Sequence, residues 1–342
     1  MYEKYVVAPT ASTIARDSKD FNIAGLHGAF CSMDGVHVVT ERIPFKLRNN
    51  HLAYKTKLTA RSYNVVVNHR RRILSTTTGH PARFNDKSLV MFDVVARKAK
   101  DGKFNDVTKF ELYRRLEDGR IVKQLFRGCW MVVDNGYHNW STTVPPIKNA
   151  VTVKQIRWSQ WIESMRKDVE CTFGILKGRW RIIKAGIRVH GEYAADSVWI
   201  TCCSLHNFLL EVDGIDSEWN SDYLGEMGNL DMEEEQCQQE NFALMRLRKS
   251  TNYRNFDISG MGRGNDVIRN NEEEENLLEE PIVDKEREQE LLGDVEKTVN
   301  VTDLSLETFR SLLVEHFDIL YHKKQIHWPS KRKNAPTIYE RR

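Results

Sequence analysis

The first 135 residues alternate between short apolar stretches and polar turns, a pattern typical of β-strands. One strand is expected to run from Gly28 to Asp34 and then either to continue or to turn back after Gly35. The apolar run before Asp134 is continuous, as in strands that are buried on both faces. The sequence predicts strands at 28–34, 36–39, 62–67, 73–78, 121–125 and 129–133.

Beyond residue 150 the apolar spacing changes to steps of three and four, which predicts helices. One amphipathic helix is expected over 156–177, and an almost wholly apolar helix, buried on most sides, over 193–212. A third helix is expected over 305–320, with Ser305 as its N-cap. We also expect a helix over 104–116. The combination of predicted strands and predicted helices in one chain indicates a mixed α/β architecture.

Charge divides the chain into two parts. Residues 1–215 hold 34 Lys and Arg against 20 Asp and Glu, whereas residues 216–342 hold 17 against 28. A basic body of this kind favours a polyanionic partner, and the acidic part is typical of a disordered extension. We predict an N-terminal segment at 1–24, a domain at 25–215, an acidic disordered linker at 216–300, and an amphipathic helix with a basic tail at 301–342.

Several classes of protein are disfavoured. No apolar run approaches the roughly 20 residues that a membrane helix needs. The six cysteines are scattered and form no spaced disulfide framework, which favours a reducing compartment. Cys202, Cys203 and His206 do not have zinc-ligand spacing and lie in an apolar helix, so we interpret them as core residues.

Three carboxylates suggest the chemistry. Asp34 and Asp134 lie where a predicted strand meets a turn, and Glu170 lies at the edge of the apolar stripe of the helix over 156–177. Carboxylates that converge from two strands and a helix repel one another unless cations neutralise them. They can hold paired divalent ions, which is the arrangement used to cut and join phosphodiester bonds.

Five sequence blocks carry a resemblance to a known family. They read Ser-Met-Asp-Gly-Val-His-Val at 32–38, Gly-His-Pro-Ala-Arg-Phe-Asn-Asp-Lys-Ser-Leu at 79–89, Asp-Asn-Gly-Tyr at 134–137, Val-Glu-Cys-Thr-Phe-Gly-Ile-Leu-Lys-Gly-Arg-Trp at 169–180, and Cys-Cys-Ser-Leu-His-Asn-Phe-Leu at 202–209. In this order, the blocks resemble the Harbinger-type transposases of the DDE endonuclease superfamily. The resemblance implies a ribonuclease-H-like core, in which helices flank a mixed central sheet.

The resemblance also implies an activity and a site. Asp34, Asp134 and Glu170 would hold two Mg²⁺ or Mn²⁺ ions, and the enzyme would cut and join double-stranded DNA at transposon ends inside the nucleus. Asp86 is either a further metal ligand or a helix cap, and both readings stay open. The expected phosphate-binding residues follow the glutamate: Lys177, Arg179, Arg181, Lys184 and Arg188.

Recognition of a specific DNA sequence is expected to lie outside the catalytic core. Relatives usually carry a helix-turn-helix segment upstream of the catalytic core, whereas this chain reaches its first acid at Asp34. Recognition is therefore expected to come either from an N-terminal region that has been lost or from a separate partner such as a Myb-like DNA-binding protein, with the acidic linker and the helix over 305–320 as candidate docking segments. A homo-oligomer is also compatible with the sequence. The basic cluster at 331–333 is either a nuclear localisation signal or an ordinary charged tail. The rival hypothesis is a domesticated, non-catalytic protein that kept the fold as a DNA-binding scaffold.

Overall fold

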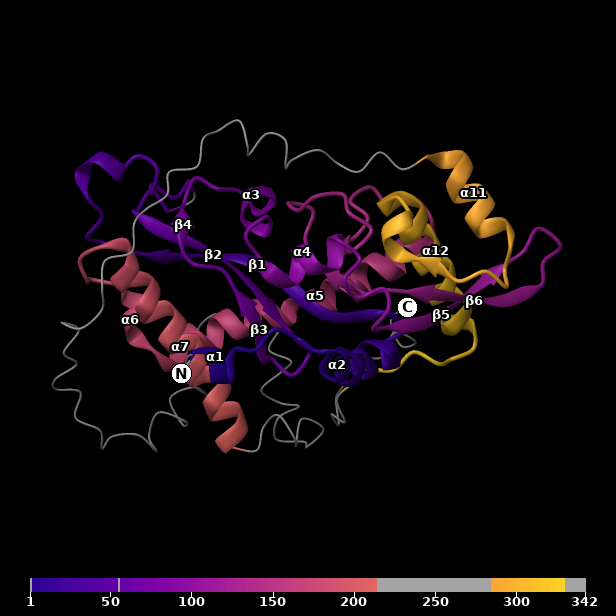
Figure 1. Ribbon diagram of the computed structural model, residues 1–342, viewed down its shortest axis with the longest axis horizontal. Coiled ribbons are helices and arrows are strands. Elements are labelled where there is room, and N and C mark those ends of the chain that lie inside the picture. Colours follow the sequence, from indigo (N-terminus) through magenta and orange to yellow (C-terminus); the bar gives the residue numbers. More distant parts are fainter. Residues whose placement is uncertain (1, 55, 214–283, 330–342) are drawn as a thin grey trace.

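A mixed sheet forms the centre of the structure. The structure, a computed structural model, describes residues 2–54, 56–213 and 284–329. The strands of the sheet lie in the order β3-β2-β1-β7-β8, and β4 pairs with β2 beside them. Their bounds are β1 Ala29–Val39, β2 Ala60–Val67, β3 Ile73–Thr76, β4 His80–Pro81, β7 Trp130–Val132 and β8 Thr143–Val144. With helices on both faces, this arrangement confirms the predicted α/β, ribonuclease-H-like core (Figure 1).

Strand β1 determines the geometry of the sheet. It pairs antiparallel with β2 and parallel with β7. The prediction left open whether the strand turns back after Gly35. In the structure it continues, so Asp34 lies inside β1 opposite Val65 and not at its end. The pairing of β1 with β7 ends at Ser32 and Val132, so Asp34 lies two positions beyond the last paired residue.

Helices cover the two faces of the sheet. Alternate β1 and β2 residues such as Val36 and Val65 pack against α5 (Val153–Arg179) and α7 (Glu192–Val212). The intervening residues, such as Met33 and Val66, pack against α2 (Ala11–Ile23) and α4 (Val94–Lys100). The remaining helices of this region are α1 (Tyr2–Tyr5), α3 (Asp86–Val90), α6 (Arg181–Ala185) and the short 3-10 turn η1 (Phe45–Leu47). Because successive side chains of a strand point to opposite faces, β1 and β2 contribute apolar residues to the core on each side of the sheet.

The helix expected over 104–116 is wrong. Residues Lys109–Arg115 form strand β5, which pairs antiparallel with β6 (Ile121–Arg127) across the turn at Asp118 and Gly119. Phe110 and Leu112 alternate with exposed neighbours and are buried against the C-terminal helix. A lone hairpin would be only marginally stable in water. The packing of the alternate apolar side chains against the C-terminal helix therefore stabilises the strand here.

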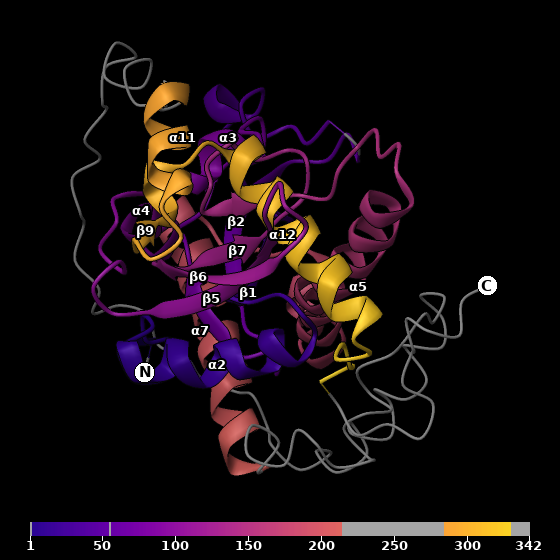
Figure 2. The same ribbon diagram turned by 90° about the vertical axis from the view of Figure 1, so that its right-hand side faces the viewer.

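The C-terminal segment is part of the same core. It comprises α11 (Lys285–Gly293), β9 (Val299–Asn300), the 3-10 turn η2 (Val301–Asp303) and α12 (Leu306–His322). Strand β9 pairs parallel with β6, and α12 lies between α5 and the β5–β6 hairpin (Figure 2). The Oγ atom of Ser305 accepts a hydrogen bond from the backbone N of Thr308, which confirms the predicted cap. The apolar face of α12 is covered by the protein itself.

The expectation of a disordered linker over 216–300 is wrong for residues 284–300, which form α11 and β9. Buried Glu288 of α11 accepts hydrogen bonds from the backbone N of Ser305 and the hydroxyl of Thr308, so it fixes the start of α12. The rest of the predicted linker and the basic cluster at 331–333 lie outside the described residues, and the division into domains stays a prediction. No helix that the structure describes has the length and apolarity to cross a membrane.

Candidate active site

Asp34 and Asp134 lie side by side near the centre of the sheet, Asp34 on β1 and Asp134 two residues after the end of the parallel neighbour β7. Ser32 of β1 is in register with Val132 of β7, and each acid follows two positions later along its parallel strand. The backbone N of Gly35 donates to Oδ1 of Asp34, and the backbone N of Gly136 donates to Oδ1 of Asp134, both at 2.8 Å. The prediction that these two side chains meet is therefore matched by the geometry.

Asp86, at the start of α3, reaches the same place. A methyl group built on Gly35 would lie 2.5 Å from Oδ1 of Asp86, and one built on Gly136 would lie 2.7 Å from its Oδ2. Any side chain at either glycine would therefore displace the Asp86 carboxylate. The helix cap is Asn85, whose Oδ1 accepts from the backbone N of Ser88 at 2.9 Å. Of the two open readings, capping belongs to the neighbour, and Asp86 faces the acids.

Glu170 joins this group through an arginine. Nη2 of Arg166 lies 2.6 Å from Oε1 of Glu170, and Nη1 lies 3.3 Å from Oδ2 of Asp34. The same guanidinium also lies 2.6 Å from Oε1 of Glu163, so one cation contacts three carboxylates. The Asp34 side chain is 18% exposed and that of Glu170 is 47% exposed. Glu170 is thus the acid with the greatest freedom to move.

The acids are not already arranged as a ligand shell. Within the described ranges, no three His, Cys, Asp or Glu side chains are placed so that they could hold a metal ion together. The Arg166 guanidinium lies between Asp34 and Glu170, where a cation shared by both would have to sit. In the structure, the positive charge that Asp34 and Glu170 share is the guanidinium of Arg166.

Electrostatics mark Asp34 as the strained member of the group. Burial raises its pKa to about 7, the negative charges of Asp134 and Asp86 push in the same direction, and Arg166 opposes them. Buried Tyr137 lies beside the same carboxylates, and burial raises the pKa of its phenol well above the ordinary value. Its hydroxyl donates to Oδ1 of Asn64 at 2.7 Å. An additional positive charge would relieve this site.

The predicted phosphate-binding residues divide into two groups. Lys177, Arg181, Lys184 and Arg188 are exposed at the end of α5, on α6 and just after it. Nε of Arg188 lies 3.0 Å from Oε2 of Glu41. Arg179 is half-buried, and its charge helps to lower the pKa of the buried His206 imidazole. The structure therefore places four of the five side chains where a polyanion can reach them.

The cysteine and histidine residues of α7 belong to the core, as the sequence indicated. Cys202 and Cys203 are buried free thiols. His206 contacts the carbonyl oxygen of Arg71 through Nε2 at 2.8 Å, so this ring nitrogen is the donor. Burial lowers the pKa of His206 to about 3 and keeps the imidazole neutral.

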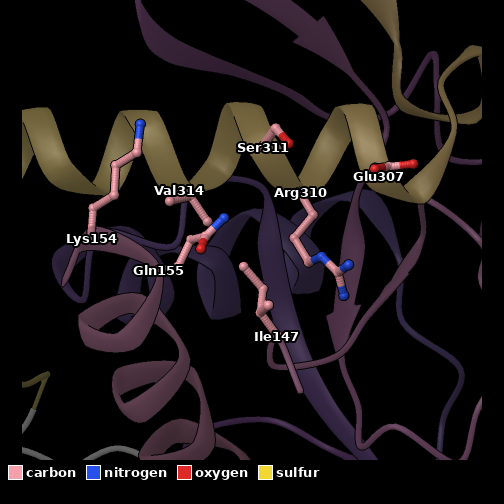
Figure 3. A pocket seen from close by; sticks show the side chains of 7 residues that line it. All are labelled: Ile147, Lys154, Gln155, Glu307, Arg310, Ser311 and Val314. Atoms are coloured by element: carbon pink, nitrogen blue, oxygen red, sulfur yellow. The ribbon is translucent and has the colours of Figure 1, made fainter. Parts of the chain in front are cut away.

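A cavity elsewhere on the molecule is separate from the acids. It has a volume of about 280 Å³ and lies between the start of α5 and α12 (Figure 3). Lys154 and Gln155 of α5 face Arg310 and Glu307 of α12 across it. Sixteen helical residues separate Lys154 from Glu170, about 24 Å along the axis. The cavity therefore takes no part in the acid cluster.

The comparison with protein families agrees with this geometry. A family model described as DDE superfamily endonuclease matches residues 33–207, just over half of the 342 residues. The chain belongs to the DDE superfamily endonucleases. The matched stretch of this DDE endonuclease contains Asp34, Asp86, Asp134 and Glu170. No curated protein and no solved structure matches the chain.

Arg166 is the site residue whose part sequence reasoning missed. The sequence places it one turn before Glu170, and residues four apart on a helix share a face, so this pairing could have been found. The contact with Asp34 depends on how α5 packs against β1, and no local signal carries it. The closeness of Asp86 to Gly35 and Gly136 is likewise a consequence of the tertiary fold.

Proposed function

We propose that this DDE endonuclease is a Harbinger-type transposase that cuts and joins double-stranded DNA at transposon ends, with divalent metal ions in a two-metal mechanism. One observation carries the proposal: carboxylates of β1 and α5, those of Asp34, Glu163 and Glu170, contact a single cation, the guanidinium of Arg166, and the charges of Asp134 and Asp86 lie close to Asp34. Such an excess of acid over base would be costly in a site with a purely structural role.

The residues fit a metal centre of this kind. Carboxylate oxygens are the ligands that Mg²⁺ and Mn²⁺ prefer. Asp34, Asp134 and Glu170 would hold the ions, and Asp86 would be a further ligand or would orient one. When bound, two such ions supply charge stabilisation for the attacking and leaving oxygens of an in-line displacement.

The protein's own groups then have distinct tasks. Asp34 and Asp134 are held rigidly by backbone N–H donors, so their oxygens are preorganised. Glu170, being more exposed, adjusts to what is bound. The exposed Lys177, Arg181 and Lys184 bind phosphates and fix the DNA in register.

The experiment is nicking of supercoiled plasmid by the purified full chain in Mg²⁺ or Mn²⁺, compared with Asp134→Asn. We expect metal-dependent nicking by the wild type and a loss of about a hundredfold or more in the variant, as for other removed charge-stabilising groups. Mn²⁺ binding, followed by electron paramagnetic resonance, should weaken in the same variant. Equal nicking rates in the two proteins would refute the assignment.

The second candidate is a non-catalytic, transposase-derived DNA-binding scaffold. The observation that favours it is Arg166, which fills the space between Asp34 and Glu170 with a permanent charge. A scaffold would bind DNA equally well with and without divalent metal, and the wild type would take up no Mn²⁺ at the acids.

We also propose that the enzyme acts in the nucleus and that a separate Myb-like protein supplies recognition of the transposon ends. The support is the family resemblance together with the net basic charge of residues 1–215, which favours DNA without reading its sequence. Binding of the purified chain to end sequence and to scrambled duplex should differ by less than about threefold unless the partner is added. Strong discrimination by the chain alone would rule out this division of labour.

A further inference from the structure

The segment between β1 and β2 exposes aromatic rings to solvent. We define the β1–β2 lobe as residues 41–59. Phe45 is 88% exposed and Tyr54 is 84% exposed, whereas aromatic side chains elsewhere are mostly in the core. Leu58 is also exposed, and the Nζ of Lys57 lies 4.3 Å from the centroid of the Tyr54 ring. Two almost fully exposed rings in one short segment indicate a contact surface.

The lobe is held in place and does not hang free. Thr40, next to it, forms a bridge with Ile187, and the backbone N of Glu41 donates to the carbonyl of Ile187 at 3.0 Å. Nε2 of buried His51 lies 2.9 Å from Oε1 of Glu192 at the start of α7. In Figure 1 the lobe is the indigo segment near α6 at the left end of the molecule. The lobe is therefore anchored to the α6–α7 connection through Glu41 and to the start of α7 through His51.

The charge around these rings has one sign. Residues 41–59 contain five Lys and Arg and one acid, and residues 177–191 contain five Lys and Arg and none. The single acid, Glu41, is paired with Arg188. A second copy of the same surface would be repelled, whereas a polyanion is attracted. Flat aromatic rings among cations fit the stacked, negatively charged structure of a nucleic acid.

The lobe lies along the same strand as the acid cluster. Thr40 follows directly after β1 and lies six positions beyond Asp34, which is about 20 Å at the rise of a β-strand. The same length corresponds to about six base pairs at 3.4 Å each. A DNA duplex cut at the acids would therefore reach the lobe about six base pairs away.

From these observations we propose that the β1–β2 lobe binds the DNA that flanks the cut, with Arg42, Lys46 and Arg48 on its phosphates and an unpaired base stacked on Phe45 and Tyr54. This inference rests on the proposed function, since it assumes that the acids act on DNA. Bases in an intact duplex present no free face, so the rings select DNA that is opened near this position.

The test is DNA binding by the full chain without divalent metal. Fluorescence anisotropy compares a nicked duplex that has one unpaired base about six base pairs from the nick with the same duplex fully paired. We expect the wild type to prefer the opened duplex by about tenfold, and the double variant Phe45→Ala/Tyr54→Ala to lose this preference. The matched control is Val151→Ala/Val153→Ala, which truncates two apolar side chains that are 85% and 69% exposed, just before and at the start of α5.

Charge and stacking are separable in the same assay. Lys46→Gln/Arg48→Gln should weaken binding to both duplexes alike and reduce the slope of log affinity against log salt by about 2, whereas the aromatic variant leaves the slope unchanged. Circular dichroism of the aromatic variant should match the wild type, because both rings are outside the core.

Two results would overturn the inference. One is an unchanged preference for the opened duplex in the aromatic variant. The other is concentration-dependent self-association of the wild type in sedimentation that the aromatic variant abolishes, which would make the lobe a contact between copies of the chain. Because no metal is present, the outcome does not depend on nicking. If Asp134→Asn nicks like the wild type while the lobe discriminates, the proposed function fails and the lobe remains a DNA contact.

Discussion

Two clusters of charge lie on neighbouring strands of the sheet and differ in balance. On β2, buried Arg61 contacts both oxygens of Asp196 at 2.8 and 2.9 Å and Oε1 of Glu192 at 3.0 Å. Tyr63 donates to Asp196 at 2.8 Å, and His51 contacts Glu192. Here every carboxylate has a donor. On β1, a single arginine faces the acid-rich group Asp34, Glu163 and Glu170, with Asp86 and Asp134 close by.

The different ratio of acids to donors distinguishes a cluster that stabilises the fold from one that suits a functional role. The charge network around buried Arg61, in which donors and acceptors match, connects β2 with α7, and removal of one member should lower the stability of the fold. In the cluster around Arg166, more carboxylates than basic side chains lie close together, so the additional negative charge contributes little to the stability of the fold. The cluster gains when something positive arrives, which is the behaviour expected of a metal-dependent site.

Replacement of Arg61 by Met should produce the largest effect on stability. It leaves Asp196, whose side chain is 13% exposed, and the more exposed Glu192 without their main partner, so the free energy of unfolding should fall by about 3–4 kcal/mol, toward the lower end of the range for a broken buried pair. Urea unfolding followed by circular dichroism measures this loss. The matched change in the unbalanced cluster, Asp134→Asn, should leave stability unchanged or raise it because it removes repulsion. A larger loss in Asp134→Asn than in Arg61→Met would reverse the comparison.

Acid should destabilise the folded protein through His206, which is buried in α7 and belongs to neither charge cluster. Its folded pKa of about 3 lies below the ordinary 6.5, so the unfolded chain binds the proton more readily. The stability it protects is therefore fully present above pH 6.5 and is lost as pH falls toward 3, by about 3 kcal/mol between pH 7 and 4. His206→Gln keeps a side-chain N–H donor and should flatten this limb of the stability curve. An equally steep acid limb in the variant would assign the effect to other groups.

Divalent metal should stabilise the unbalanced cluster. At a Mn²⁺ concentration of a hundred times the dissociation constant, the free energy of unfolding should rise by about 2.7 kcal/mol. Urea titrations with and without Mn²⁺ give the shift in midpoint. Asp34→Asn should abolish the shift, while a substitution of His51 in the balanced network should leave it intact. A shift that survives Asp34→Asn would place the ion elsewhere.

Removal of the Arg166 charge should tighten metal binding modestly. The guanidinium competes for Asp34 and Glu170, and each partly exposed pair contributes up to about 1 kcal/mol, so Arg166→Gln should bind Mn²⁺ about fivefold more tightly. Titration calorimetry with Mn²⁺ tests this, and Lys167→Gln on the exposed face of α5 is the matched control. Weaker binding in Arg166→Gln would mean that the arginine positions the acids and does not compete for them.

The sequence was most informative where the signal is local or repeated along the chain. The apolar stripe of α5 and the cap at Ser305 could both be predicted, and the observed helix boundaries lie within a few residues of the expected ones. From the sequence alone, strand β5 could not be distinguished from a helix. Its apolar side chains are buried against α12, which lies almost 200 residues further along the chain. Long-range packing of this kind leaves no mark on the local pattern.

The candidate site divides in the same way. The sequence placed Asp34 and Asp134 at the ends of two predicted strands, and the structure adds that these strands are parallel neighbours with Ser32 in register with Val132. The positions of Asp86 and Arg166 depend on the docking of α3 and α5 against these strands, which periodicity does not determine. The tertiary structure therefore adds the partners of the acids, and the sequence supplies the acids themselves.

The docking of β9 and α12 into the core has a consequence for the integrity of the molecule. Phe309, Leu313 and Phe317 are buried against residues of the first 165 positions, and each such side chain contributes about 1.5–3 kcal/mol by its burial. A single break of the backbone anywhere in 214–283 would therefore leave two fragments that stay associated and co-purify under native conditions. Expressed separately, residues 1–213 and 284–342 should reassemble into one particle.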